Sequence, residues 1–152
     1  LEVIKKIEDK EIFVDVIVGK ANKNKKLIKK KCDEEKNFSF HHQITNMKQF
    51  LYKADLAIGA GGVSTWERCC MGLPSIVIII AKNQEQGIIE LAKKNCLINL
   101  GKYGKIKEND YLKIIKNLSS KKLNQMSKES MKIVDGKGTT RVAKHISLIM
   151  RR

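Results

Sequence analysis

The sequence predicts an α/β fold, a doubly wound parallel sheet of about five strands with helices on its faces. Short β-branched runs alternate with longer amphipathic segments along nearly all of its 152 residues. Residues 75–80 (SIVIII) are almost wholly apolar, as expected for a central parallel strand that helices cover on both faces. The glycine-rich and polar residues concentrate just after the expected strands, at the edge where such sheets bind ligands.

Each expected strand is a short apolar run that ends at polar or turn-forming residues. The run 12–18 (IFVDVIV) is β-branched and ends at Gly19, which predicts a buried first strand. The segment 54–58 runs directly into glycines, so that we expect the loop after it to begin at Gly59. The same patterns predict five strands in all, over residues 12–18, 38–41, 54–58, 75–80 and 96–100.

The expected helices are amphipathic segments with recognisable ends. Residues 20–36 predict a polar loop followed by a helix with a thin apolar stripe. Thr45 or Asn46 is suited to cap the next helix, and Gly72 with Pro74 ends the one after it. Further helices are predicted over residues 47–52, 64–71, 83–94, 109–117, 121–133 and 139–150.

Composition predicts one folded domain over residues 1–152 and argues against several function classes. The net charge of +15 favours anionic ligands, but the chain has only four Arg and 5% aromatic residues, with Lys spread throughout. Proteins that recognise base edges in duplex DNA favour Arg, and proteins that bind single strands need clustered aromatic side chains on which the bases stack. We therefore expect no nucleic-acid partner. No run approaches the ~20 apolar residues that span a bilayer, so no membrane span is expected.

The cysteines predict a reduced, cytoplasmic protein without a metal site. Cys32, Cys69, Cys70 and Cys96 lack the C-x-x-C spacing of zinc sites and of redox motifs. They are typical of small buried residues in a reducing compartment. No D-x-D sequence is present to hold a metal-bridged diphosphate, and the chain predicts no cofactor.

A glycine-rich loop, GAGGVST at residues 59–65, carries the strongest functional signal. Glycines at the change from strand to helix allow positive φ angles and close approach of a ligand to the backbone. Free N–H groups at the start of the helix, with the hydroxyls of Ser64 and Thr65, suit a phosphate. The alternative is a tight turn with no ligand, because the order of glycines matches neither the dinucleotide fingerprint nor a Walker loop.

Two residues of the following helix allow both a structural and a functional interpretation. Glu67 lies three residues after Ser64, which is the spacing of a capping box. Its carboxylate could instead accept hydrogen bonds from both hydroxyls of a ribose. Trp66 is more typical of core packing than of a platform on which a ligand stacks.

The run 54–84 (ADLAIGAGGVSTWERCCMGLPSIVIIIAKNQ) closely resembles the carboxyl-terminal half of the UDP-sugar hydrolases of the pseudaminic acid pathway. That family is related to spore-coat polysaccharide biosynthesis proteins and, more distantly, to the N-acetylglucosaminyltransferase of peptidoglycan synthesis. Weaker similarity extends over residues 13–46 and 135–143. The resemblance implies the Rossmann-like C-terminal domain of a GT-B architecture, with the N-terminal catalytic domain absent from this chain.

The resemblance also implies a UDP site, position by position. Ile44 would meet uracil through its backbone, and Glu67 would bind the ribose. Gly19 and Asn22 would line the loop after the first strand, beside the phosphates. The diphosphate would be held by the glycine loop, through Gly59, Gly61, Gly62, Ser64 and Thr65.

The sugar and the catalytic groups are less well specified by this resemblance. Asn83 and Gln84 would reach the phosphates or the sugar, and their amides offer the donors and acceptors that hydroxyls require. The family's catalytic residues come from the domain that this chain lacks. We therefore predict no catalytic residue here, and His41, His42 and His145 are expected to be solvated or packed.

The resemblance implies the UDP-binding half of a nucleotide-sugar hydrolase in surface polysaccharide or nonulosonic acid biosynthesis. Its substrate would be of the UDP-2,4-diacetamido-2,4,6-trideoxy-hexose type, and its partners UDP or a UDP-sugar and its own N-terminal domain. One alternative is the donor-binding domain of a GT-B glycosyltransferase. A second alternative is a stand-alone nucleotide-binding or regulatory module.

Overall fold

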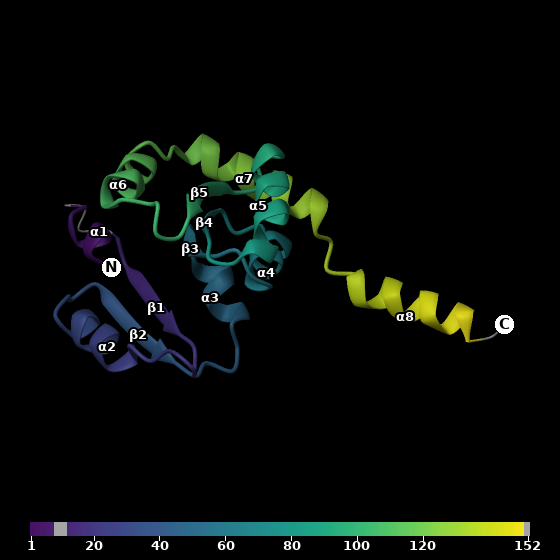
Figure 1. Ribbon diagram of the computed structural model, residues 1–152, viewed down its shortest axis with the longest axis horizontal. Helices are drawn as coiled ribbons and strands as arrows, with labels where there is room; N and C mark the ends of the chain where they lie inside the picture. Colours follow the sequence, from purple (N-terminus) through teal and green to yellow (C-terminus); the bar gives the residue numbers. More distant parts are fainter. Residues whose placement is uncertain (8–11, 151–152) are drawn as a thin grey trace. The chain divides into compact units, whose positions relative to one another are not determined.

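The computed structural model describes residues 1–7 and 12–150 and divides the chain into two compact units (Figure 1). The first unit comprises Leu1–Phe50 and the second Leu51–Arg152. Each unit is an α/β arrangement with its own parallel strands, and each is described by itself below.

The first unit is built on a pair of parallel strands. β1 (Val14–Val18) pairs with β2 (Phe38–His42) in register from Val14 opposite Phe38 to Val18 opposite His42. α2 (Lys25–Asp33) connects the two strands and packs against β2, and Cys32 is its one buried residue. A short helix that the sequence did not predict, α1 (Glu2–Lys5), precedes them. α3 (Lys48–Lys53) begins after both Thr45 and Asn46, so neither is the residue that directly precedes its first turn.

The second unit contains a three-stranded parallel sheet in the order β3-β4-β5. Its strands are β3 (Ala57–Ala60), β4 (Ser75–Ile79) and β5 (Ile98–Lys102), with a register irregularity at Val77/Ile78 where β4 meets β5. α4 and α5 pack against the strands, and α7 packs against α4. The helices of this unit are α4 (Ser64–Cys70), η1 (Lys82–Gln84), α5 (Glu85–Lys93), α6 (Glu108–Lys116), α7 (Ser120–Ile133) and α8 (Gly138–Ile149).

The core of the second unit centres on β4, as its wholly apolar sequence predicts. Ile76 and Val77 are fully buried, and Val77 lies in one core cluster with Ile88 and Leu91 of α5. The buried Ser130 hydroxyl of α7 donates to the Cys96 carbonyl at 2.9 Å, which satisfies both groups. Because β4 is central and its neighbours are parallel to it, the carboxyl ends of all three strands lie at one edge of this sheet.

The α/β class with parallel strands is confirmed, with two differences from expectation. Hydrogen bonds group the five strands as a pair and a triplet rather than as one sheet among the described residues. β3 lies further along the chain than the predicted 54–58, so that Gly59 belongs to the strand and not to the loop.

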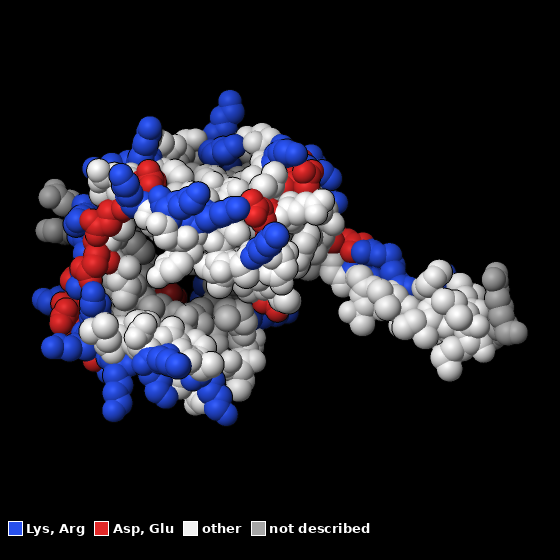
Figure 2. Space-filling model, viewed as in Figure 1, with Lys and Arg blue, Asp and Glu red and all other residues white. Residues whose placement is uncertain are grey.

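The surface features bear on the predicted partners. Lys and Arg are spread over the face in Figure 2 among scattered Asp and Glu, and they form no single basic patch on that face. Within the described residues, no helix is long and apolar enough to cross a membrane.

The described residues contain no group of three or more potential metal ligands among His, Cys, Asp and Glu. Cys32, Cys69 and Cys96 are buried free thiols, and Cys70 is half-buried.

α8 differs from α7, the other helix of more than ten residues, because it contributes no buried residue. Its largest apolar side chains, among them Val142, Ile146 and Ile149, are all more than half exposed. Asp135 stands before the helix, where it accepts hydrogen bonds from the Lys137 backbone N–H at 3.0 Å and from Arg141 Nη1 at 2.7 Å.

Candidate functional site

The chain passes from β3 into α4 through residues 59–65, which we call the glycine turn. The N–H of Gly61 donates to the Ile78 carbonyl at 3.0 Å, which ties the turn to the neighbouring strand β4. The next three amides, of residues 62–64, have no hydrogen-bond acceptor within the described chain. The turn therefore presents a run of free N–H donors at the carboxyl edge of the sheet.

The glycines are required by packing and not by backbone conformation. None of Gly59, Gly61 and Gly62 has a positive φ, so this part of the sequence-based prediction is wrong. A Cβ on Gly61 would lie 2.7 Å from Ile88 Cγ1, which no side chain tolerates, and one on Gly59 would lie 3.2 Å from Arg68 Nη1. Two of the glycines thus make room for the protein's own side chains.

Arg68 lies buried against this turn, with 6% of its surface exposed. Its Nη1 donates to Ser64 Oγ, and its Nη2 donates to both the Ala60 carbonyl and Thr65 Oγ1, all at 3.1 Å. The Nε atom is buried without a hydrogen-bond partner, and no carboxylate of the described residues pairs with the guanidinium. Burial lowers the pKa of Arg68 from its ordinary value, yet Arg remains charged at neutral pH.

The two hydroxyls predicted to hold a diphosphate differ in exposure. Ser64 is partly exposed and accepts from Arg68. Thr65 is 1% exposed, and its hydroxyl donates to the Ala60 carbonyl at 3.3 Å while it accepts from Arg68. Contact between Thr65 and a phosphate would require this internal network to open, whereas Ser64 already lies at the surface.

Glu67 does not close the capping box that its spacing allows. α4 begins at Ser64 after Val63, and no side chain caps its first turn. The Glu67 side chain is exposed and forms no ion pair with another described residue, although its charge acts on nearby Arg68. Its carboxylate is therefore available to a ligand.

Trp66 is not a core residue, and the packing interpretation of it is wrong. It is 46% exposed on α4, one residue before Glu67. A Cβ built on Gly87 of α5 would lie 3.9 Å from Trp66 Cζ2, so the indole lies over the neighbouring helix at a glycine. An exposed indole of this kind offers an apolar surface beside the glycine turn.

Gln84 and Asn83 lie on η1, in the loop that follows β4. The side-chain oxygen of Gln84 accepts a hydrogen bond from the Ile80 N–H at 3.0 Å. The same amide group reaches the glycine turn, because it lies 3.3 Å from a Cβ built on Gly61 and 4.0 Å from one on Gly62. Asn83 is exposed. The structure thus brings Gln84 to the predicted diphosphate loop.

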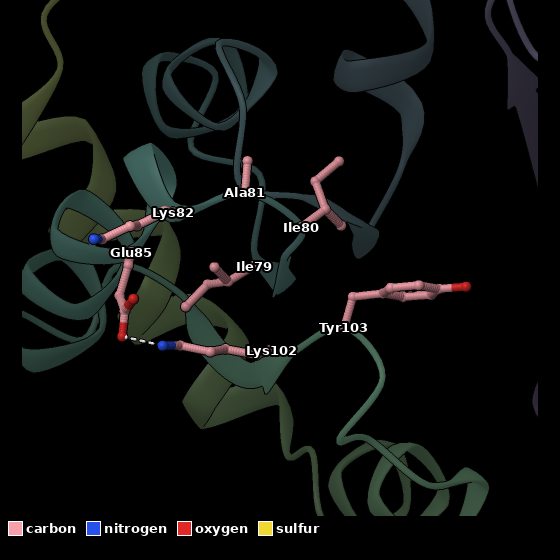
Figure 3. Close-up of a pocket in the computed structure, with 7 residues that line it drawn as sticks. All are labelled: Ile79, Ile80, Ala81, Lys82, Glu85, Lys102 and Tyr103. Carbon is pink, nitrogen blue, oxygen red and sulfur yellow. Dashed lines mark ion pairs between the residues drawn. The ribbon is translucent and has the colours of Figure 1, made fainter.

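An open pocket of about 380 Å³ lies at the carboxyl ends of β4 and β5. Figure 3 shows Glu85 and Lys102 facing each other at one side of it, joined by an ion pair of 2.7 Å, while the Tyr103 side chain points to the opposite side. Ile80 and Tyr103 are exposed apolar groups of its lining. The complete lining is Ile79, Ile80, Ala81, Lys82, Glu85, Lys102 and Tyr103.

Gly19 and Asn22 lie in the first unit, in the loop after β1. The Asn22 N–H donates to the Gly19 carbonyl at 3.1 Å, and the Asn22 side-chain oxygen accepts from the Asn24 N–H at 2.8 Å. A Cβ on Gly19 would meet nothing within 4 Å. This loop is therefore shaped by its own hydrogen bonds, with open space beside Gly19.

Ile44 lies in the loop after β2, next to Gln43, which has a positive φ of 55°. No backbone hydrogen bond joins Ile44 to another described residue, so its amide and carbonyl are free to meet a base. In the preceding strand, His41 Nε2 lies 2.6 Å from Asp15 Oδ1, and His42 Nε2 is buried without a partner within the described chain.

The predicted site residues therefore form two groups. The glycine turn, Glu67 and Gln84 come together at the carboxyl edge of the β3-β4-β5 sheet, and Asn83 lies beside Gln84. Gly19, Asn22 and Ile44 follow the carboxyl ends of β1 and β2 in the first unit. Sequence reasoning missed Arg68, although its spacing of four from Ser64 and three from Thr65 places both hydroxyls on its face of the helix.

The chain is similar in sequence to two kinds of known protein. Spore coat polysaccharide biosynthesis protein SpsG of Bacillus subtilis (strain 168) is 27% identical over 139 residues, which are 90% of this chain and 40% of that protein. The UDP-N-acetylglucosamine–N-acetylmuramyl-(pentapeptide) pyrophosphoryl-undecaprenol N-acetylglucosamine transferase of Helicobacter pylori (strain Shi470) is 38% identical over 68 residues, 41% of this chain and 18% of the transferase. The same protein of strain ATCC 700392 / 26695 matches equally well.

The chain thus spans about 40% of the length of SpsG and less of the transferases. None of these relatives carries the name of a hydrolase, so the comparisons fit the transferase alternative better than the hydrolase expectation. The model of the glycosyltransferase family 28 C-terminal domain matches residues 1–146, which is nearly the whole chain. The chain belongs to the glycosyltransferase family 28 C-terminal domain family, the carboxyl-terminal half of a GT-B-like architecture.

Proposed function

We propose that this chain binds the nucleotide-sugar donor, with UDP as its nucleotide, for a GT-B glycosyltransferase. The observation that carries the proposal is the glycine turn, where three consecutive free amides lead into α4, the helix that carries the exposed Glu67 about one turn further along. The transferases among the relatives act, by their name, with UDP-N-acetylglucosamine. Binding of a nucleotide-sugar donor is consistent with the free amides of the glycine turn and with the UDP-sugar in the name of these relatives.

The diphosphate of the donor is proposed to lie against the amides of residues 62–64. Backbone N–H groups can neutralise a phosphate without a metal ion, and Ser64 adds a hydroxyl at the surface of the same turn. The side-chain amide of Gln84 reaches the turn from the loop after β4 and can donate to a phosphate or a sugar hydroxyl. Asn83 is proposed to contact the sugar or the phosphates beside it.

The ribose is proposed to be bound by Glu67, whose two oxygens can accept from both of its hydroxyls. Uracil would meet the free backbone groups of Ile44, and the loop of Gly19 and Asn22 would lie beside the phosphates. These three residues of the first unit keep the roles that the family resemblance implies.

Isothermal titration calorimetry of this chain with UDP tests the proposal. We expect micromolar binding of UDP and clearly weaker binding of ADP, because backbone contacts to uracil select the pyrimidine. A folded chain that releases no heat with UDP or with UDP-N-acetylglucosamine would contradict the proposal. Equal binding of UDP and ADP would contradict the assignment of uracil to Ile44.

Transfer and hydrolysis are distinguished by their products in the protein that contains this domain. Incubation with a UDP-sugar but without an acceptor should leave the sugar nucleotide largely intact if the protein is a transferase. Rapid release of free reducing sugar together with UDP would show a hydrolase instead. In both cases the proposed donor site of this chain is the same.

A further inference from the structure

Arg68 is a buried cation that forms no ion pair with a carboxylate of the described residues. Burial lowers its pKa, and the nearby acidic groups of Cys69 and Glu67 offset only part of this effect. Arg68 is 6% exposed, and one of its nitrogens, Nε, has no hydrogen-bond partner in this part of the chain. A buried charge without compensation is strongly unfavourable, and a protein usually supplies a partner or a bound ion of opposite sign. The described residues provide only neutral oxygens for it.

The neutral oxygens that Arg68 contacts all belong to the glycine turn. Nη2 donates to the Ala60 carbonyl, at the end of β3, and Nη1 donates to the hydroxyl of Ser64, at the start of α4. One guanidinium therefore joins both sides of the turn that presents the free amides of residues 62–64. It holds the shape of this turn and also places a full positive charge directly beside it.

We infer that Arg68 is a positioning residue for an anion at the glycine turn, and that this anion completes its counter-charge. The ligand class is a diphosphate, as in a nucleoside diphosphate, so the inference rests on the function proposed above. Arg68 is not proposed to touch the ligand, because Ser64, Ala60 and Thr65 occupy three of its N–H groups and its Nε atom is buried. It acts by orienting the amides and through its field, which is poorly screened at a buried position.

A purely structural cross-link across the turn would not require a charge. A glutamine at this position could donate a neutral hydrogen bond to a carbonyl without the cost of burying an ion. A lysine would keep the charge but lose the forked geometry that contacts three oxygens together. These two substitutions therefore separate the electrostatic role of Arg68 from its role as a bridge.

The test compares the affinities of UDP and uridine, measured by calorimetry on this chain. The variants are Arg68→Gln and Arg68→Lys. The matched control is Arg141→Met, which alters an exposed arginine of α8 that pairs with Asp135. Wild type should prefer UDP strongly over uridine. Arg68→Gln should reduce this preference by about tenfold or more while the affinity for uridine stays the same. Arg68→Lys should restore part of it, and Arg141→Met should leave it unchanged.

Other outcomes identify which claim fails. Wild type that binds neither ligand contradicts the proposed function and this inference with it. Wild type that prefers UDP, with the preference fully retained in Arg68→Gln, overturns the role of Arg68 alone, as does an equal loss of UDP and uridine binding. If Arg68→Gln does not fold, inorganic diphosphate should raise the melting temperature of wild type above that in chloride of equal ionic strength. No such rise would overturn the inference.

Discussion

Gly61 and Ile88 lie so close together that a Cβ on the glycine would be 2.7 Å from Ile88 Cγ1 and 3.1 Å from its Cδ1. Ile88 is 3% exposed and belongs to the core of the second unit, so it has little room to move. The glycine turn is therefore built directly on α5 and the core. Any change in packing at this contact is expected to alter the loop that presents the free amides.

Gly61→Ala should lower the free energy of unfolding by about 1–3 kcal/mol, because overpacking forces a core side chain or the backbone to shift. Gly62→Ala is the matched control, since a Cβ there would meet only Gln84 Nε2 at 4.0 Å, and neither glycine has a positive φ. Urea unfolding of the two variants measures the difference. Equal stability of both would contradict the steric argument.

Glu67→Ala should weaken UDP binding by about 1 kcal/mol or more through loss of hydrogen bonds to the ribose. The same variant should unfold within about 0.5 kcal/mol of wild type, because Glu67 is exposed and caps nothing. Calorimetry with UDP and with 2′-deoxy-UDP gives the readout. The variant should lose more affinity for UDP than for the deoxy analogue, and equal losses would argue against a ribose contact.

Gly19→Val should leave stability unchanged within about 0.5 kcal/mol, because a side chain there meets no atom within 4 Å. It should still weaken UDP binding if the phosphates pass beside this loop as proposed. Gly138→Val, at another open glycine, serves as the control in the same calorimetric titration. Unchanged affinity in Gly19→Val would remove the loop after β1 from the site.

Asp135 should titrate far below an ordinary aspartate. The hydrogen bond from Arg141, together with that from the Lys137 backbone, lowers its pKa from 3.8 to about 2. Because the pKa is lower in the folded state, the stabilisation by this carboxylate is present above pH 3.8 and is lost as the pH falls through about 2. Carbon-13 NMR of the carboxyl group measures the midpoint directly, and Arg141→Met should move it upward. A midpoint near 3.8 in wild type would show that the pair does not persist in solution.

The succession of strands and helices was predictable because it follows from hydrophobic periodicity. The fully buried Ile76 and Val77 of β4 lie in the run SIVIII, and Gly72, with a φ of 65°, ends α4 where glycine was expected. The grouping of strands was not predictable, because periodicity describes each strand and not its neighbours. For the same reason the start of β3 was misplaced by three residues, since Ala54 and Leu56 continue the apolar pattern.

The candidate site was predictable where it depends on the backbone and less so where side chains decide. The motif predicted a turn from strand to helix with free amides, which the structure contains. Ligand binding by this turn and by Glu67 stays a prediction. Trp66 was assigned to the core because a lone indole usually is, and Arg68 was overlooked because arginine is rarely buried. Tertiary packing overrides the usual burial of Trp and the usual exposure of Arg. Only the hydroxyls of Thr65 and Ser64, three and four residues before Arg68, indicated which groups it would contact.

The absence of any buried residue in α8 has a consequence for its dynamics. A helix of 12 residues is at the limit of what can persist in water on its own, since packing supplies most helical stability in proteins. In this chain alone, the amide protons of α8 should exchange with deuterium at rates close to those of an unstructured peptide, while those of β4 stay protected for far longer. Any molecule that covers Val142, Ile146 and Ile149 would reveal itself by slowing that exchange.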